Sequence, residues 1–237
     1  MDYFRNIVLI AAIAGAVAGL ATTVAQQLTT EPLILKAEVY EEQVAVPAAH
    51  DQRNPARASA HEHEDEGWAP SNGFERTAFS LLANVLTGVG FALLLVAASE
   101  VAGGIRSWRQ GVFWGLAGFA VFTLAPILGL PPELPAMPAA ELGARQLWWF
   151  ATAASTAVAL GLLVYGRSPW AVLAAIALLV APHLIGAPQP ASYETPIPEA
   201  LHHSFAVAVV LTTLLFWVLL GGLAGLLRGR FLSHDKS

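Results

Sequence analysis

Residues 205–227 read FAVAVVLTTLLFWVLLGGLAGLL, an unbroken apolar stretch without a charged side chain. A helix that crosses about 30 Å of hydrocarbon needs about 20 such residues, so this stretch predicts a transmembrane helix. The whole 237-residue chain agrees, because 56% of its residues are hydrophobic and only 12% are charged. A soluble fold of this length cannot hide so much apolar surface in one core. The lipid bilayer is therefore the expected solvent.

Five other stretches have the same apolar character. The predicted spans are 7–28, 77–99, 112–130, 146–165, 170–186 and 205–227. The runs are uniformly apolar rather than alternating, which predicts an all-α polytopic membrane protein and argues against a β-barrel. We expect one membrane domain of about six transmembrane helices, with five as the alternative because 170–186 is the shortest stretch. Only residues 166–169 separate the fourth and fifth spans, which predicts a tight antiparallel hairpin.

The first span is interpreted as a retained anchor, because its apolar run is longer than the core of a typical cleaved signal peptide. Basic residues in short loops indicate orientation. With six spans, one side carries Arg5, Arg106, Arg109, Arg167, Arg228, Arg230 and Lys236, and the other carries Lys36, Arg53, Arg57, Arg76 and Arg145. This bias predicts that both termini are cytoplasmic in a bacterial-type inner membrane. Most acidic residues and six of the seven histidines then belong to the outer side.

Several classes of protein are disfavoured by what the chain lacks. It has no cysteine, which excludes disulfides, thiolate metal sites and iron–sulfur clusters. The net charge of −5 makes nucleic acid an improbable partner. The two lysines, Lys36 and Lys236, do not stand in a phosphate-binding Gly-Lys-Ser/Thr motif, so we expect no ATP hydrolysis by this chain. We also expect no enzymatic activity and no resident cofactor, because ligands deep in several helices are missing.

A long acidic loop, about 29–76, follows the first span. It is too polar and too rich in Ala and Pro to build a core, so its middle, 44–67, is expected to be disordered. It contains His61-Glu62-His63-Glu64-Asp65-Glu66. Imidazole and carboxylate groups together suit divalent transition metals, which makes His61 and His63 candidate metal ligands. A solvated acidic spacer is the alternative interpretation.

A second group of candidate metal ligands precedes the last span. Pro196 and Pro198 predict that a helix begins nearby, so Glu199, His202 and His203 share its first turns. His183 follows Pro182 near the outer end of the fifth span. We expect these groups to meet at one mouth of the bundle and to bind a divalent cation. Hydrogen bonding of the histidines to headgroups and water is the alternative.

Polar residues inside the predicted spans concentrate in their outer parts. Gln26, Gln27, Asn84 and Gln146 are the amides of this set. Buried amides need partners in lipid, so we expect them to face the interior and to form a polar vestibule beneath the histidines. Simple structural bonding between helices is an equally ordinary role for each of them.

Several blocks of the chain carry a resemblance to a known family. They are QQLT (26–29), EPLILKAEVYE (31–41), FERT (74–77), ANVLTG (83–88), PPELP (131–135), GARQLWW (143–149) and PHLIGAP (182–188). In these blocks the chain resembles the CbtA family of cobalt transporter subunits. The resemblance implies a membrane subunit for cobalt uptake, needed for corrinoid synthesis, that works beside a small one-span partner, CbtB. Members of the family are commonly described with five spans.

The expected function is therefore capture of cobalt or a similar divalent cation at the outer face, followed by passage through the helical bundle. A membrane scaffold that binds no metal is the alternative. It would use faces of small residues such as Gly15-x-x-x-Gly19, Gly111 with Gly115, and Gly221 with Gly225, which let helices approach closely within the chain or against another subunit.

Overall fold

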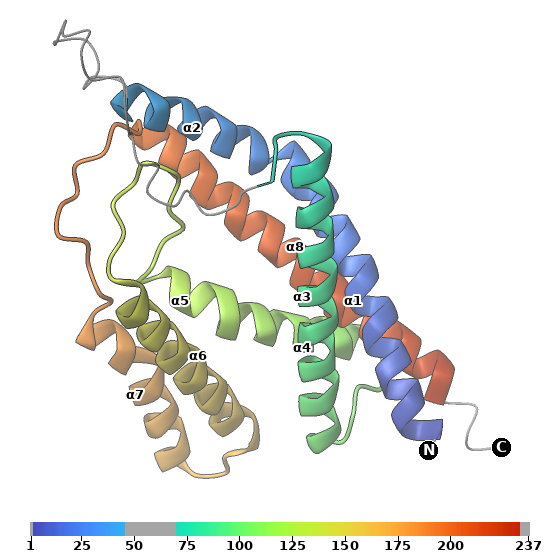
Figure 1. Cartoon of the computed structure of the whole chain (residues 1–237). Coiled ribbons are helices and arrows are strands. Elements are labelled where there is room, and N and C mark those ends of the chain that lie inside the picture. Colours follow the sequence, from blue (N-terminus) through green and yellow to red (C-terminus); the bar gives the residue numbers. More distant parts are fainter. Residues whose placement is uncertain (1, 46–69, 233–237) are drawn as a thin grey trace, which may run out of the picture.

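The computed structural model describes residues 2–45 and 70–232, and every regular element in these ranges is a helix (Figure 1). The elements are α1 (Asp2–Leu28), α2 (Glu31–Ala45), α3 (Phe74–Val101), α4 (Trp108–Phe119), the π-helix η2 (Ala120–Leu124), α5 (Ala125–Ile127), α6 (Leu142–Tyr165), α7 (Pro169–Ile185) and α8 (Glu199–Leu232). The prediction of an all-α membrane protein is confirmed. The greater part of the acidic loop, with His61 and His63, lies outside the described residues.

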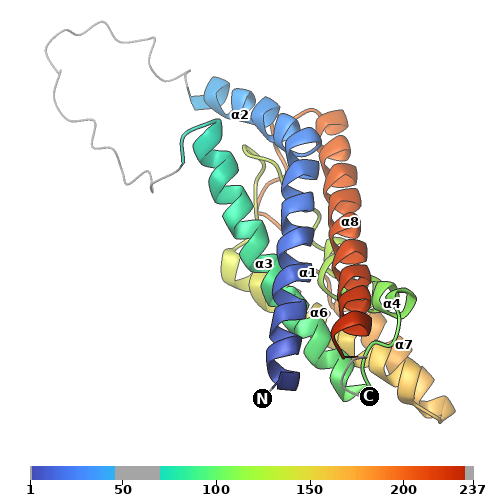
Figure 2. The ribbon, with the colours of Figure 1, turned by 90° about the vertical axis from the view of Figure 1, so that its right-hand side faces the viewer.

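Five helical segments of the described chain are long and apolar enough to cross a membrane, and α7, with 17 residues, is shorter. The chain changes direction at each connection, so α1 begins and α8 ends at the same end of the bundle (Figures 1 and 2). We call this the terminal end, and we call the opposite end, where α1 passes into α2, the α2 end. Glu100 stabilises the terminal end by accepting hydrogen bonds from Tyr3 and Arg228.

Glycines allow two helix pairs to pack with their backbones in contact. A Cβ at Gly15 of α1 would overlap the backbone of Gly88 and Val89 in α3. A Cβ at Gly221 of α8 would likewise overlap the carbonyl oxygen of Gly111 in α4. Small residues are the usual means of close approach in membranes, where no hydrophobic effect drives helices together. The main glycine faces seen in the sequence are thus occupied by this chain's own helices.

The principal core lies between α1, α3, α4 and α8. It includes Ile10, Val96 and Leu220, all fully buried or nearly so. Aromatic rings extend it, since Trp217 stacks on Phe122 with ring centroids 5.7 Å apart. The predicted span 112–130 is not one regular helix: its α-helical pattern gives way to η2 at 120–124, just before Pro126. Proline has no N–H to continue the hydrogen-bond ladder, and a π-turn is one way to absorb that break.

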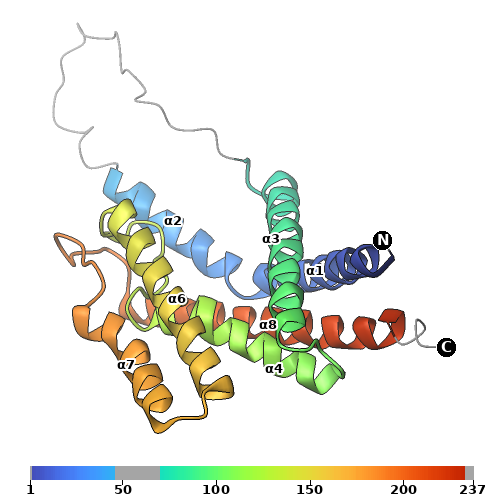
Figure 3. The same cartoon turned by 90° about the horizontal axis from the view of Figure 1, so that it is seen from below.

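The α6–α7 hairpin stands to one side of this core (Figure 3). Ser168 caps α7 by accepting a hydrogen bond from Trp170 N, and Pro169 occupies the first turn, where a missing N–H costs nothing. The predicted antiparallel hairpin is confirmed. The hairpin meets the rest of the bundle where α6 packs on η2 and α5.

One prediction for the long loop was wrong. Its first part was expected to be too polar to contribute to a core, yet residues 31–45 form α2 and Ala37 is fully buried. Ala37 belongs to a small second core with Leu134, Ile197 and Phe205, which come from two connecting segments and the start of α8. Helix α2 is only weakly amphipathic in sequence, and its burial depends on these distant segments.

Candidate metal-uptake site at the α2 end

Asn84 of α3 is the centre of a polar cluster between α1 and α3. Its Nδ2 donates hydrogen bonds to Thr23 Oγ1 at 3.0 Å and to Gln26 Oε1 at 2.6 Å. Thr23 is only 5% exposed, so this contact lies inside the bundle. Three oxygen-bearing side chains thus meet about one-third of the way along the two helices.

A second set of polar contacts lies nearer the surface. Gln27 Nε2 donates to Thr77 Oγ1 at 3.2 Å and also contacts the carboxylate of Glu31. On the side of α8, Thr29 and Thr212 lie within hydrogen-bond distance through their hydroxyl oxygens, at 3.3 Å. Two hydrogen-bonded clusters therefore follow one another along α1 and α3: Asn84 with Thr23 and Gln26, and, nearer the α2 end, Gln27 with Thr77 and Glu31. We call the residues Glu31, Gln27, Thr77, Gln26, Asn84 and Thr23 the polar track.

The polar track ends abruptly on its inner side. A Cβ at Gly19 would lie 2.5 Å from the carbonyl oxygen of Asn84, and the Gly15–Gly88 contact follows one turn further on. The backbones of α1 and α3 therefore touch directly below the track. This direct backbone contact closes the interface between α1 and α3 below Asn84.

Glu199, His202 and His203 lie in the first turns of α8, as the two prolines predicted. His202 Nε2 is 3.1 Å from the carbonyl oxygen of Pro132. A carbonyl oxygen only accepts, so Nε2 carries the proton and Nδ1 of the neutral ring keeps its lone pair. His203 and Glu199 are exposed to the surroundings.

His183 lies in the last turn of α7 and packs edge-on against Trp148 of α6, with ring centroids 5.8 Å apart. The Trp148 indole donates to the carbonyl oxygen of Pro182 at 3.2 Å. Trp148 also packs against Gly129. His183 and His202 therefore flank the same connecting segment, 129–132, one through Trp148 and the other through Pro132.

Gln146 is separate from the other three amides. It is exposed on the first turns of α6 and lines a hollow of about 380 Å³ with Pro132 and Glu133. Arg145 and Glu133 form an ion pair of 3.0 Å beside it. The structure thus brings Gln26, Gln27 and Asn84 into one neighbourhood and leaves Gln146 in another. Within residues 2–45 and 70–232, no three His, Asp or Glu side chains are grouped closely enough to hold a metal ion.

Sequence reasoning missed two parts of this site. It did not single out Glu31, which begins α2 directly after the turn that ends α1 and contacts Gln27 there. It also missed the ion pair between Arg76 of α3 and Glu38 of α2, with 2.8 Å between Nη2 and Oε1. That contact depends on the burial of α2, which no local pattern signals.

Comparison with known protein families shows the class of this protein. The family model described as "Probable cobalt transporter subunit (CbtA)" matches residues 4–229, nearly the whole chain. The chain belongs to the CbtA family. It is therefore a multi-pass membrane protein of a family described as subunits of a probable cobalt transporter. No curated protein and no solved structure matches the chain.

Because the chain belongs to the CbtA family, the polar groups at the α2 end can be compared with the ligands that cobalt accepts. Cobalt in its divalent state accepts oxygen and imidazole ligands, and both kinds are present there. As a transporter subunit, a CbtA protein also implies partner subunits.

Proposed function

We propose that this chain captures hydrated cobalt at its α2 end and passes it into the helical bundle through the polar track. The observation that carries this proposal is the succession of two clusters of oxygen ligands along α1 and α3, Glu31 with Gln27 and Thr77, and then Gln26 with Asn84. Carboxylate, amide and hydroxyl oxygens can replace water molecules around a divalent cation one at a time. The closed base beneath Asn84 then represents the state before the ion is released inward.

The proposal requires the α2 end to face the outside and both termini to be cytoplasmic. Basic residues support this orientation, since the described ones at the terminal end are Arg5, Arg106, Arg109, Arg167, Arg228 and Arg230. The described acidic residues at the α2 end are Glu31, Glu38, Glu41, Glu42, Glu75, Glu133, Glu141, Glu194 and Glu199. This negative charge raises the local concentration of cations.

Histidines provide the first inner-sphere ligands in this proposal. His203 and Glu199 are exposed on the first turns of α8, and His202 keeps Nδ1 available because Nε2 is engaged with Pro132. A metal-ligating histidine typically donates its other ring N–H to a carbonyl or carboxylate in this manner. His183 would join from α7 across the segment 129–132. Because only neutral imidazole binds a metal, cobalt binding should weaken in acidic solution.

We further propose that the partner subunit is the small one-span CbtB-type protein that the family resemblance implies. The scaffold alternative drew its support from the glycine faces. Gly15, Gly111 and Gly221 are filled by helices of this chain, so they no longer favour a second subunit.

Uptake of radiolabelled cobalt by cells expressing the chain with its neighbouring genes tests the proposal. Glu31→Gln and Gln27→Leu should each reduce uptake at least several-fold, because each breaks the polar track. Glu194→Gln is the matched control, since Glu194 is exposed at the same end but makes no contact with the track. Normal uptake by both track variants, at normal expression, would refute the proposed route.

Cobalt binding to the purified protein tests the histidine ligands separately. His183→Ala and His202→Ala/His203→Ala should lower the affinity for cobalt at about pH 7.5 more than at about pH 5.5, where protonation already weakens wild-type binding. Equal binding by all variants would remove the histidines from the site and leave the polar track unaffected.

A further inference from the structure

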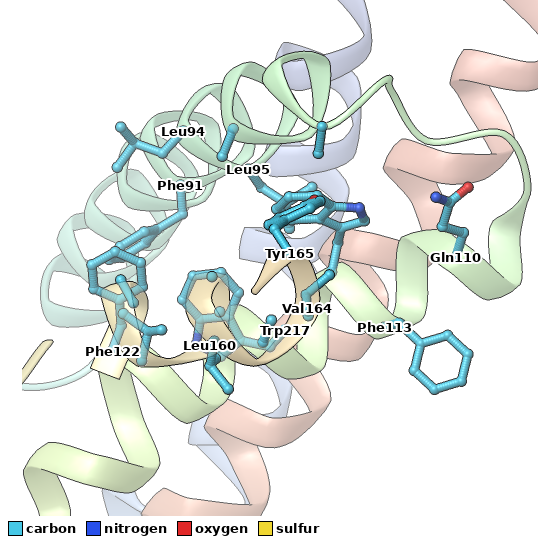
Figure 4. Close-up of a pocket in the computed structure, with 18 residues that line it drawn as sticks. Phe91, Leu94, Leu95, Gln110, Phe113, Phe122, Leu160, Val164, Tyr165 and Trp217 are labelled. Atoms are coloured by element: carbon cyan, nitrogen blue, oxygen red, sulfur yellow. The ribbon is translucent and has the colours of Figure 1, made fainter. Parts of the chain in front are cut away.

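A cavity lies between α3, α4 and α6, away from the polar track. Its volume is about 590 Å³, and its wall is almost entirely apolar (Figure 4). Helix α6 packs on η2 and α5, and the cavity separates the rest of α6 from α3. Leu94, Phe113 and Val164 lie on its rim and are more than half exposed, so the cavity opens sideways toward the lipid.

The cavity has the depth of one leaflet. On α3 it extends from Phe91 to Ala102, which at 1.5 Å per residue is about 16 Å, or roughly half of a 30 Å hydrocarbon core. Its deep end is closed by the aromatic cluster of Phe91, Phe122 and Trp217. Its shallow end is at the terminal end of the bundle, beside Gln110 and Tyr165.

The depth of the cavity indicates which kind of molecule fits in it. A partner's transmembrane helix needs the full thickness of the membrane, about 30 Å, and the aromatic cluster stops the cavity at half of that. A hydrated cation needs polar ligands, and no charged side chain lines the wall. A hydrocarbon chain that enters from one leaflet matches both the depth and the apolar wall.

The shallow end carries positive charge. Arg109 directly precedes Gln110, and Arg167 follows Tyr165 by two residues; both arginines are exposed. The backbone N–H of Arg106 donates to Gln110 Oε1 at 2.9 Å, which holds this third arginine beside the same side chain. The carboxylate nearest in sequence, Glu100, is already paired with Arg228. Basic residues between transmembrane helices near the membrane surface suit anionic headgroups.

We propose that this cavity binds one acyl chain of an anionic phospholipid from the leaflet at the terminal end, with the headgroup held by Arg106, Arg109 and Arg167. The bound lipid fills the space between α3 and the α6–α7 hairpin and so fixes the hairpin against the main core. This role does not depend on the proposed cobalt route.

The test measures phospholipid retained by the full-length protein after purification from membranes of equal phosphatidylglycerol and phosphatidylcholine content. Native mass spectrometry should find phosphatidylglycerol retained in clear excess over phosphatidylcholine. Gly161→Leu should abolish retention, because Gly161 lines the cavity and a Cβ there meets no atom within 4 Å. Gly90→Leu is the matched control: Gly90 has equally open surroundings, lies on α3 and does not line the cavity.

Further variants separate the headgroup from the chain. Arg109→Gln/Arg167→Gln should shift the retained lipids toward the membrane ratio, whereas Arg230→Gln, at the same end on α8, should leave the preference unchanged. Ala157→Leu offers a second filling variant if Gly161→Leu does not fold. Unchanged retention by both filling variants would overturn the proposal. A photoreactive residue introduced in place of Leu94 should cross-link to lipid. Cross-linking to a protein instead would also overturn the proposal.

Discussion

Asn84 illustrates how a single amide couples two membrane helices. Its side chain donates to Thr23 and Gln26 of α1, and the backbone around it contacts Gly19. Without water in the bilayer core, these groups must satisfy one another. The Asn84 side chain is therefore a structural link between α1 and α3 and also part of the polar track. The two roles considered from the sequence, bonding between helices and lining of a polar vestibule, are compatible.

Replacing Asn84 by leucine should destabilise the fold by about 1–2 kcal/mol, because two interhelical hydrogen bonds of the size found in membrane proteins are lost. Thermal unfolding in detergent measures this change. Thr87→Leu, one turn further along α3 and exposed, is the control and should unfold near the wild-type temperature. Equal unfolding temperatures for Asn84→Leu and the wild type would show that the cluster contributes little to stability.

At the scale of helices, packing is governed by two glycine contacts and by well-defined helix ends. The α4–α8 pair depends on Gly111 and Gly221, while neighbouring Gly222 meets only Val112 Cγ2 at an ordinary 3.5 Å. Two adjacent glycines thus have opposite structural roles. Hydropathy cannot tell them apart, because both lie in the same apolar run.

Gly221→Ala should destabilise the protein by about 1–3 kcal/mol through overpacking against the Gly111 carbonyl. Gly222→Ala should be neutral or stabilising, because alanine favours the helix by about 1 kcal/mol over glycine. Size-exclusion chromatography after graded heating compares the two. A Gly222→Ala variant as unstable as Gly221→Ala would contradict the α4–α8 packing described above.

The start of α6 has a charged cap outside the membrane span. The Glu141 carboxylate accepts hydrogen bonds from Gly143 N at 2.8 Å and Ala144 N at 2.7 Å. These two N–H groups favour the ionised form and lower the pKa of Glu141 below its usual value. A lowered folded-state pKa stabilises the fold above the unfolded pKa, and the contribution disappears as the pH falls through the folded pKa.

The stability advantage of the wild type over Glu141→Gln should therefore be constant near neutral pH and shrink once the pH falls below about 4.3, the usual pKa of glutamate. Unfolding temperatures of both proteins across this range measure the effect. Parallel curves for the two proteins at all pH values would mean that the cap does not depend on the charge of Glu141.

For the whole molecule, the direction of α7 decides the topology. Helix α7 has 17 residues, and together with the connecting segment 186–198 it returns the chain to the α2 end, where α8 begins. We propose that α7 crosses the membrane as a sixth span, which places the start of α1 and the end of α8, both in contact with Glu100, on one side. An odd number of crossings would separate these two ends.

The absence of native cysteines makes this topology directly testable. Ser192→Cys, between α7 and α8, should react with a membrane-impermeant maleimide on intact cells. Arg167→Cys, between α6 and α7, should react only after permeabilisation, and the cysteine-free wild type is the control for background. Labelling of both from the same side would show that α7 does not cross, and the reverse pattern would overturn the proposed orientation.

The sequence by itself determined the membrane character, the helical class and the α6–α7 hairpin. Hydropathy and proline positions are local properties of the sequence, so a stretch such as 205–227 indicates a membrane environment without information from the rest of the chain. The blocks at 26–41 and 182–188 likewise indicated the CbtA family before the family model matched.

Only the tertiary structure decided which distant groups meet. Asn84 finds Thr23 and Gln26, Gln146 lies elsewhere, α2 is buried by segments from three other regions, and a leaflet-deep cavity opens beside α6. Each of these results depends on the rotation and separation of whole helices. Those quantities follow from the sum of many side-chain contacts in three dimensions, and no short window of sequence contains them.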